Sequence, residues 1–433
     1  MKPNTEKYLK NEIEVIVNLY KQNKLNEALN LSNELVIKNN NVPFVLNLNG
    51  LINLSLEKWQ NAISVFKKAI NCDSNFVEAY NNLGVAYIHL GEHENAIENY
   101  HKAIEIKKDY ANAYNNLATH YDDIGNYNEA VKFYVNALNY NSNHILAQNN
   151  LIHLMNYYNP DQFEESPIIK ANNEIKKINI DFSLNDKISN SDIGTYFKKC
   201  NKIVKKNLKN LNFIDSQIHR RNGYNLNCDR HKKAFDNHNI IPKYCFTCFK
   251  VQIELKAVSE LIKLFFIFDQ LVLPNDNIRK CFVELRQKIK GSYKALIYCS
   301  SMDDANEVSK IVNSCLVKIL NNEFKLDIKR GCTEFDIAYP GYKDAKNLDI
   351  IKYKDDWKQM EVMIDQEIQN GSKKGKKFFS KSLNGVGLGD VLIINNWLDY
   401  AKIIGDESYL DISDDFFSSS YILNQIKNRD FKS

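Results

Sequence analysis

The sequence of 433 residues lacks the signals that mark secreted, membrane-spanning and nucleotide-binding proteins. Its longest apolar run, "LIKLFFIFDQLVL" at 261–273, contains Lys263 and Asp269 and is too short to span a membrane. The first residues carry no apolar segment of the signal-peptide kind, and no P-loop motif is present. Nine cysteines, an odd number, favour reduced thiols. We therefore expect a cytoplasmic protein with no membrane partner.

Histidine is absent from the last 195 residues, and no HExxH motif occurs. A Ser-His-Asp or Cys-His mechanism in that part would have to use His219, His231 or His238. Cys299 lies where a predicted strand meets a predicted helix, a place where a helix dipole lowers thiol pKa values, although such a cysteine is usually strand core. No catalytic residue is therefore predicted, and an enzyme is the less favoured interpretation.

Arginine is scarce and unevenly placed. Of seven arginines, six lie between 220 and 330, and eight of the nine cysteines lie between 200 and 332. Either the forked geometry of the guanidinium matters in this region, or this region is the densest folded core. Residues 161–345 carry 31 Lys and Arg against 23 acids, a net charge of +8, whereas the flanking segments are slightly acidic. We expect the chemistry of the protein to lie in this central part.

A 34-residue repeat dominates the N-terminal third. The segment "VEAYNNLGVAYIHLGEHENAIENYHKAIEIKKDY" at 77–110 aligns with 111–144, and 43–76 follows in the same register. A weaker copy occupies 9–42, and a helix at 145–158 is expected to cap the stack. Aromatic, small and leucine residues match between the two clearest copies: Tyr80 and Tyr114, Leu83 and Leu117, Gly84 and Ala118, Tyr87 and Tyr121, Gly91 and Gly125, Ala96 and Ala130, Tyr100 and Tyr134, Ala103 and Ala137.

This pattern resembles the tetratricopeptide repeat (TPR) family, whose unit is a helix–turn–helix. The resemblance covers about residues 9–158 and implies an all-α solenoid over 1–158. Repeats of this kind bury their apolar faces only by stacking, and the stack forms a concave surface. The resemblance therefore implies a scaffold that binds a protein or peptide partner in the groove of the solenoid.

Asparagines recur with the same period in the first helix of each repeat. The set is Asn47, Asn81, Asn82, Asn115, Asn116, Asn149 and Asn150. Because a carboxamide offers two donors and an acceptor, a row of them can pair with the backbone of an extended peptide. The row is similar to the asparagine ladders of TPR arrays in O-linked N-acetylglucosamine transferases, and we predict a peptide-binding groove. The alternative is that these amides only brace neighbouring helices. Glu78, Asp122 and Asp123 nearby favour a basic or neutral peptide.

The rest of the chain, from 160 to 433, resembles no family that we identify. We expect a polar linker and a helix over 159–215, a Cys-rich α+β domain over 216–345 and a mostly helical C-terminal extension over 346–433. Within the α+β domain three segments have strand character and predict a small, mainly antiparallel sheet: "YCFTCFKVQIEL", "KCFVELRQKIKGSYKALIYCS" and "FKLDIKRGCTEFDIAYP". Ser301 is expected to cap a helix that runs to about Leu320.

The central part also contains two pairs of metal-ligand residue types, each pair with a two-residue gap: Cys228 and His231, Cys245 and Cys248. Such a gap lets two ligands on one tight turn reach the same ion, and four soft or borderline ligands suit tetrahedral zinc. We predict a structural Zn²⁺ site, in which His238, Cys281 or Cys332 could replace any one ligand. An iron–sulfur or other redox metal, and thiols that pack without a metal, stay open as alternatives.

Two further motifs are weaker. The run "HRRNGYNLNCDRHKK" interleaves Tyr224 with basic residues, as nucleic-acid surfaces do, although a solvated rim is the more ordinary interpretation. Gly385, Gly387 and Gly389 precede a predicted helix and could offer amides to a phosphate, but Asp390 is more simply the cap of that helix.

Taken together, the residues favour an interaction or scaffold protein with a TPR groove and a zinc-stabilised second module. An enzyme of transferase or thiol type, with the repeats recruiting a protein substrate, is the second interpretation. A nucleic-acid-binding protein is the third and is not favoured.

Overall fold

The computed structural model describes most of the chain: residues 3–179, 189–208, 211–221, 226, 228–286, 289–320, 323–371, 381–418 and 421–426. These residues form two compact units. The repeat unit comprises the described residues of Met1–His144 and Asp365–Phe378, and the sheet unit those of Ile145–Ile364 and Phe379–Ser433. No helix in the described ranges is both long enough and apolar enough to cross a membrane.

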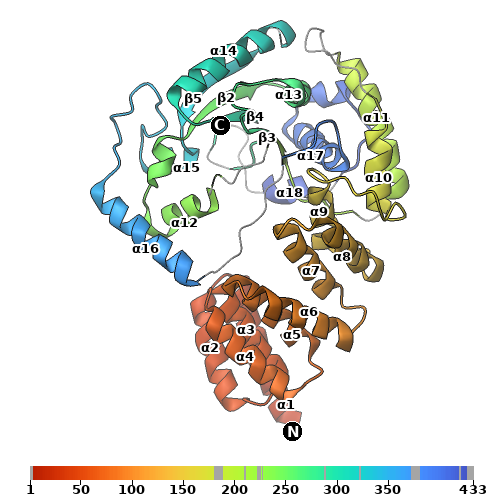
Figure 1. Ribbon diagram of the computed structural model, residues 1–433, viewed down its shortest axis with the longest axis vertical. Helices are drawn as coiled ribbons and strands as arrows, with labels where there is room; N and C mark the ends of the chain where they lie inside the picture. Colours follow the sequence, from red (N-terminus) through yellow and green to blue (C-terminus); the bar gives the residue numbers. More distant parts are fainter. Residues whose placement is uncertain are drawn as a thin grey trace. The chain divides into compact units, whose positions relative to one another are not determined.

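The N-terminal part of the repeat unit is a series of helices that pair into hairpins in chain order (Figure 1). The starts of the third, fifth and seventh helices coincide with the first residues of the 34-residue copies at 43, 77 and 111. The helices are α1 (Pro3–Lys21), α2 (Leu25–Lys38), α3 (Pro43–Ser55), α4 (Trp59–Cys72), α5 (Val77–Leu90), α6 (His93–Ile106), α7 (Ala111–Asp123) and α8 (Tyr127–Tyr140).

Small residues let the two helices of each hairpin touch. A Cβ atom added to Gly50 would lie 2.3 Å from Cε1 of Phe66, and one added to Gly84 would lie 2.5 Å from Cε1 of Tyr100. Because both separations are far below van der Waals contact, only glycine fits beneath these rings. The small–aromatic matches of the repeat are therefore packing positions.

The sheet unit contains five described strands in the order β1-β3-β4-β2-β5, and every neighbouring pair is antiparallel. This is the small antiparallel sheet that the strand-like segments predicted. The strands are β1 (Gln217–Arg220), β2 (Phe249–Leu255), β3 (Arg279–Val283), β4 (Tyr293–Cys299) and β5 (Phe324–Arg330).

Helices surround this sheet (Figure 1). Their bounds are α9 (Ile145–Leu154), α10 (Pro167–Lys176), α11 (Asn190–Asn207), α12 (Cys228–His238), α13 (Val258–Gln270), α14 (Met302–Ile319), α15 (Thr333–Ala338), α17 (Leu388–Ile404) and α18 (Tyr421–Ile426), with 3-10 turns η1 (Lys243–Phe246) and η2 (Glu407–Asp411). Helix α16 (Asp355–Gly371) begins in the sheet unit, and its residues from Asp365 on belong to the repeat unit. Ser301 caps α14 by accepting a hydrogen bond from the Asp304 amide at 3.1 Å, as its sequence predicted.

The two faces of the sheet differ in character because side chains alternate along each strand. Val251, Ile253, Ala295 and Ile297 point to one face and are fully buried. This face packs against α13 and α14. The opposite face carries the polar residues of the same strands, Lys250 of β2 among them. This polar face is covered by other elements, so we expect a ligand site of the sheet unit to lie on it.

Helix α17 lies at the centre of the sheet unit and not at its edge, because almost all of its residues are buried. The indole of Trp397 donates to the carbonyl of Ser216 at 2.8 Å, and the amide of Asn396 donates to the carbonyl of Asp215 at 2.7 Å. The segment expected to be a C-terminal extension therefore supports the start of β1.

Two local predictions were wrong. Cys228 and His231 lie in the first turn of α12, not on a tight turn, because "CDRHKKAFDNH" forms a helix. The residues after β5 fold as α15, not as strand. Asp390 caps α17, as the more ordinary interpretation of the glycine-rich entry held: its carboxylate accepts the Gly387 amide at 2.9 Å and pairs with Arg220.

The contacts of the buried arginines explain why arginine is concentrated in this part of the chain. Arg220 is buried and its guanidinium bonds Asp269 at 2.8 Å and both carboxylate oxygens of Asp390 at 3.1 and 2.9 Å. Arg279 is fully buried and donates to the carbonyls of Asn277, Phe268 and Leu271. Arg330 likewise donates to backbone carbonyls, those of Tyr342, Leu348 and Ile351. The fork of the guanidinium thus holds separate chain segments together, which a lysine could not do at several acceptors at once.

Candidate functional sites

The asparagines of the repeat unit connect neighbouring repeats. Asn82 donates from Nδ2 to Oδ1 of Asn47 at 2.9 Å, and Asn116 donates in the same way to Asn81 at 2.9 Å. Asn47, Asn81 and Asn115 are buried, whereas Asn82 and Asn116 are only half-buried. Asn47 and Asn81 therefore accept hydrogen bonds between neighbouring repeats, and the two half-buried amides are held in fixed orientations.

The half-buried amides keep unused bonding capacity. Oδ1 of Asn82 accepts a long hydrogen bond from Asn81 at 3.3 Å, and Oδ1 of Asn116 accepts one from Asn115 at 3.4 Å. In the described part of the chain, one N–H and one oxygen lone pair of each of these two amides have no partner. A donor and an acceptor side by side suit a peptide group.

Asn149 and Asn150 belong to the sheet unit. The side chain of Asn149 shows how an amide at this position of the helix binds the backbone of another segment. Its Nδ2 donates to the carbonyl of Asn212 at 2.8 Å, and its Oδ1 accepts from the amide of Ile214 at 3.1 Å. One carboxamide thus holds two backbone groups of a passing segment, whatever the side chains of that segment are.

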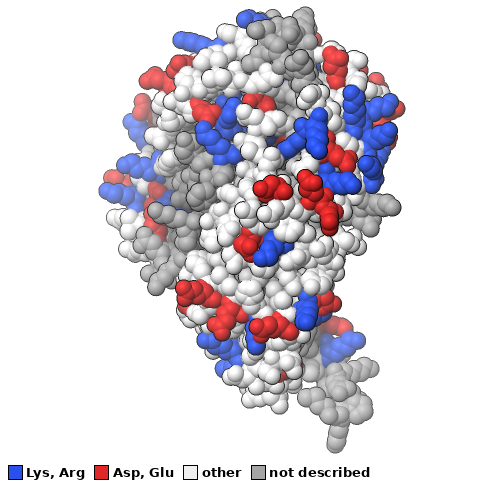
Figure 2. Space-filling model, turned by 45° about the vertical axis from the view of Figure 1, so that its right-hand side comes forward, with Lys and Arg blue, Asp and Glu red and all other residues white. Residues whose placement is uncertain are grey.

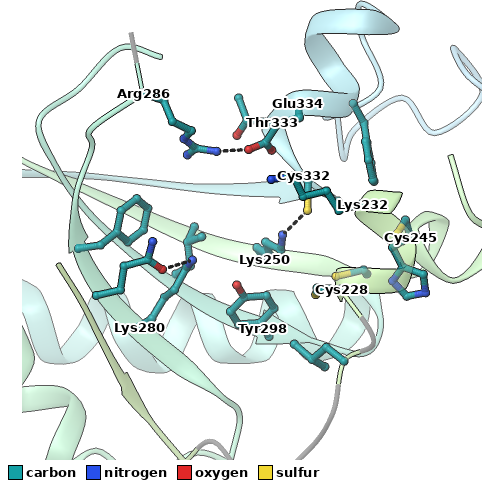
Figure 3. A pocket seen from close by; sticks show the side chains of 18 of the residues that line it. Cys228, Lys232, Cys245, Lys250, Lys280, Arg286, Tyr298, Cys332, Thr333 and Glu334 are labelled. Atoms are coloured by element: carbon teal, nitrogen blue, oxygen red, sulfur yellow. Dashed lines mark hydrogen bonds and ion pairs between the residues drawn. The ribbon is translucent and has the colours of Figure 1, made fainter. Parts of the chain in front are cut away.

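A cavity of about 540 Å³ lies over the polar face of the sheet (Figure 3). Strands β2, β3, β4 and β5 supply its floor, and residues of α12, η1, α15 and α18 contribute to its walls. Side chains of lysine, arginine, tyrosine and cysteine point into it (Figure 3). Its volume is that of typical small-molecule sites in proteins.

All four predicted zinc ligands line this cavity: Cys228, His231, Cys245 and Cys248. Cys332 lines it too, whereas Cys281 and His238 do not. Nevertheless, among the residues that the structure describes, no three His, Cys, Asp or Glu side chains are placed to hold one metal ion. His231 instead stacks on Tyr244 with ring centroids 5.2 Å apart. Zinc binding stays a prediction.

Burial governs the ionisation of the thiols. It raises the pKa of Cys245 and of Cys248, and neighbouring thiols raise both further. It also raises the pKa of Cys299 to about 12, so this thiol is not the activated nucleophile that its place before α14 could have produced. Thiolates in the cavity would require a cation beside them, and Lys250 Nζ lies 3.2 Å from Sγ of Cys332.

Lysines of three strands form the feature of the cavity that the sequence interpretation missed. Lys250, Lys280 and Lys329 line its floor. Burial and, second to it, the charge of Lys250 lower the pKa of Lys280 to about 8 and that of Lys329 to about 7. The alternation in "FKVQIEL" and "FKLDIKR" indicates that Lys250 and Lys329 lie on the polar faces of their strands, but not that other elements cover this face.

The arginines of the basic run considered for nucleic-acid binding form ion pairs within the protein. Arg221 pairs with Asp276 at 3.3 Å, and Arg230 pairs with Glu361 at 3.0 Å. Tyr224 lies outside the described residues. On the face of the molecule shown in Figure 2, acidic and basic side chains are interspersed. These contacts leave the run without the free guanidinium groups that a phosphate backbone would need.

Comparison with known proteins identifies the repeats. Residues 75–141 match the family described as tetratricopeptide repeat, and residues 50–91 match that described as TPR repeat. No curated protein matches the chain.

Several solved structures are similar to part of the chain. A crystal structure of MamA is 27% identical over 31% of this chain and 78% of its own, with a TM-score of 0.29. A thermophilic TPR protein of Thermus thermophilus is 19% identical over 34% of this chain and 80% of its own, with a TM-score of 0.32. The first TPR of Spaghetti (RPAP3), bound to the HSP90 peptide SRMEEVD, is 23% identical over 26% of this chain and 89% of its own, with a TM-score of 0.25.

The two family matches overlap and together cover residues 50–141. They contain the helix pairs whose small and aromatic residues interlock at Gly84 and Tyr100. The N-terminal region of this chain is therefore a tetratricopeptide repeat segment.

Proposed function

We propose that the protein is an interaction protein whose repeat unit binds an extended segment of a partner protein. The observation that carries this proposal is the pair of half-buried amides, Asn82 and Asn116, each fixed by a neighbouring repeat at 2.9 Å. Because their side chains are already ordered, binding a peptide costs little of the rotamer entropy that a mobile side chain would lose.

The mode of binding follows from the amide chemistry. Each of the two amides donates to a peptide carbonyl and accepts from a peptide N–H, as Asn149 does with Asn212 and Ile214. Recognition of this kind reads the backbone and is largely independent of peptide sequence. Selectivity comes from charge: Asp122 and Asp123 end α7, so the preferred segment is basic or neutral.

A peptide selection tests the proposal. Phage-displayed random peptides are selected on the full-length protein, and the affinity of the best ones is measured by fluorescence anisotropy. The double variant Asn82→Ala, Asn116→Ala should bind these peptides roughly tenfold more weakly or worse, because each amide contributes about two hydrogen bonds.

The matched control is Asn99→Ala, since Asn99 lies on the second helix of a repeat and its amide bonds only the carbonyl of Asn95. This variant should bind like the wild type. The double variant should melt at a lower temperature because it leaves the buried Oδ1 atoms of Asn47 and Asn81 without a donor, so binding is measured well below the melting temperature of every variant. Selection of no peptide, or equal loss of affinity in the double variant and the control, would contradict the proposal.

A further inference from the structure

The cavity of the sheet unit holds lysines at positions where like charges face one another. Lys250 of β2 and Lys329 of β5 are directly opposite in the antiparallel register. Lys280 of β3 lies on the same face of the sheet and lines the same cavity. Like charges that are directly opposite on neighbouring strands destabilise a sheet, and burial increases the cost of each ammonium group.

The partners of these lysines are neutral. Nζ of Lys280 donates to Oε1 of Gln217 at 3.1 Å, and Nζ of Lys329 donates to Oγ1 of Thr333 at 3.1 Å. In the described part of the chain, neither lysine forms an ion pair with a carboxylate. Figure 3 shows Lys250 and Lys280 pointing into the cavity.

Two of the carboxylates that line the cavity are already used by other cations, and the other two, Asp229 and Asp236, are exposed on α12. Glu284 is buried and pairs with Lys294 at 3.2 Å and with Arg286 at 2.7 Å, and Arg286 also pairs with Glu334. Two cations and two carboxylates make this network neutral. It therefore leaves the charge of Lys280 and Lys329 without compensation.

Lys250 has a different possible counter-charge, because it contacts Sγ of Cys332 at 3.2 Å. A thiolate, or a metal held by the thiols, would neutralise it. The contacts of Lys280 and Lys329 offer no such route, since an amide oxygen and a hydroxyl carry no charge. An anion from outside the protein would compensate these two lysines in their protonated form.

The walls of the cavity are suited to an organic molecule. Phe235, Phe282, Leu296, Tyr298 and Phe335 line it together with the lysines. Aromatic and aliphatic side chains around a few charged groups are the usual construction of a small-molecule site. The volume of about 540 Å³ accommodates a ring or short chain in addition to an anionic group.

We propose that this cavity binds a small organic oxyanion, a carboxylate or a phosphate ester, with the charged group between Lys280 and Lys329 and the apolar part against the aromatic wall. This is a second site, separate from peptide binding by the repeats. Its failure or success says nothing about Asn82 and Asn116.

Isothermal titration calorimetry on the full-length protein in phosphate-free buffer tests this inference. The probes are phenyl phosphate and benzoate, which separate the two oxyanion sources, with inorganic phosphate and neutral benzyl alcohol beside them. At least one aromatic anion should bind at a single site with a Kd of about 1 mM or tighter, and benzyl alcohol should not bind. Binding of neither aromatic anion overturns the proposal.

Variants locate the site. Lys280→Met and Lys329→Met should each weaken binding about tenfold or more, whereas Lys329→Arg, which keeps the charge, should retain most of it. Lys325→Met is the matched control, because Lys325 lies on the same strand but is exposed and paired with Asp327 at 2.6 Å. If a methionine variant does not fold, the comparison of Lys329→Gln with Lys329→Arg replaces it. Binding that persists in both lysine variants contradicts the assignment.

Discussion

The buried lysines make the stability of the sheet unit depend on pH in a way that can be calculated. The pKa of Lys329 is lowered to about 7 by burial and by the charge of Lys250. In the unfolded chain the same side chain has a pKa of about 10.4. Below pH 7 the lysine is protonated in both states, and the folded state bears the full cost of the buried charge. Between pH 7 and 10.4 the unfolded chain binds more protons, so stability rises with pH.

Between pH 7 and pH 9 this single group should stabilise the folded state by about 2 kcal/mol. Lys280, with a pKa lowered to about 8, should add about 1 kcal/mol over the same interval. The buried thiols oppose this trend, because the pKa of Cys248 is raised by burial and unfolding releases its proton as the pH increases. The wild-type profile alone therefore does not isolate the lysines.

The difference in stability between the wild type and a variant that lacks Lys329 isolates this one lysine. Lys329→Met should be more stable than the wild type at pH 7, and this advantage should shrink by about 2 kcal/mol at pH 9. Lys325→Met is the control and should show no such shift, because Lys325 is exposed on the same strand. Urea unfolding in a Trp59→Phe background, followed by tryptophan fluorescence, reports the sheet unit through Trp357 and Trp397. An advantage that is equal at both pH values within about 0.5 kcal/mol would refute the reasoning.

Three further predictions concern the fold and the thiols. Arg220→Ala should destabilise the sheet unit by about 3–5 kcal/mol in urea unfolding, since it leaves the buried Asp390 unpaired, and a loss below about 1 kcal/mol would contradict this. Gly84→Ala should cost about 1–3 kcal/mol in the thermal unfolding of the repeats, because the new methyl group collides with Tyr100; an unchanged melting temperature would be the opposing result. If the predicted zinc site forms, elemental analysis should find about one zinc per chain, and Cys245→Ser should lose both the metal and several degrees of melting temperature. Protein purified without chelator and free of zinc would oppose that site.

The repeats were predictable because the same residue types pack against each other in every copy. A small residue under an aromatic ring recurs every 34 residues, so the helices, their pairing and their order follow from the chain alone. Helices capped by local chemistry were also predictable, as Ser301 before α14 shows. The start of such a helix depends on a hydrogen bond between residues close in the sequence, so the sequence alone predicts it.

The cavity was not predictable because its residues are brought together by strand order. Gln217, Lys250, Lys280 and Lys329 lie far apart in the sequence and meet only in the arrangement β1-β3-β4-β2-β5. The spacing of Cys228 and His231 suggested a tight turn, but the sequence between them also suits a helix, and the helix formed. Local pattern indicates which face of an element is polar, while tertiary contacts determine whether that face is open or covered.

The central claim is that the repeats bind the backbone of a peptide through Asn82 and Asn116, and replacing peptide bonds tests it most directly. In a selected peptide, single amides are replaced by esters, which removes one N–H at a time and preserves the side chains. At one or two positions the ester should weaken binding to the wild type by about 0.5–1.5 kcal/mol and leave binding to the Asn82→Ala, Asn116→Ala variant unchanged. If every ester weakens binding equally in both proteins, these amides do not bind the backbone.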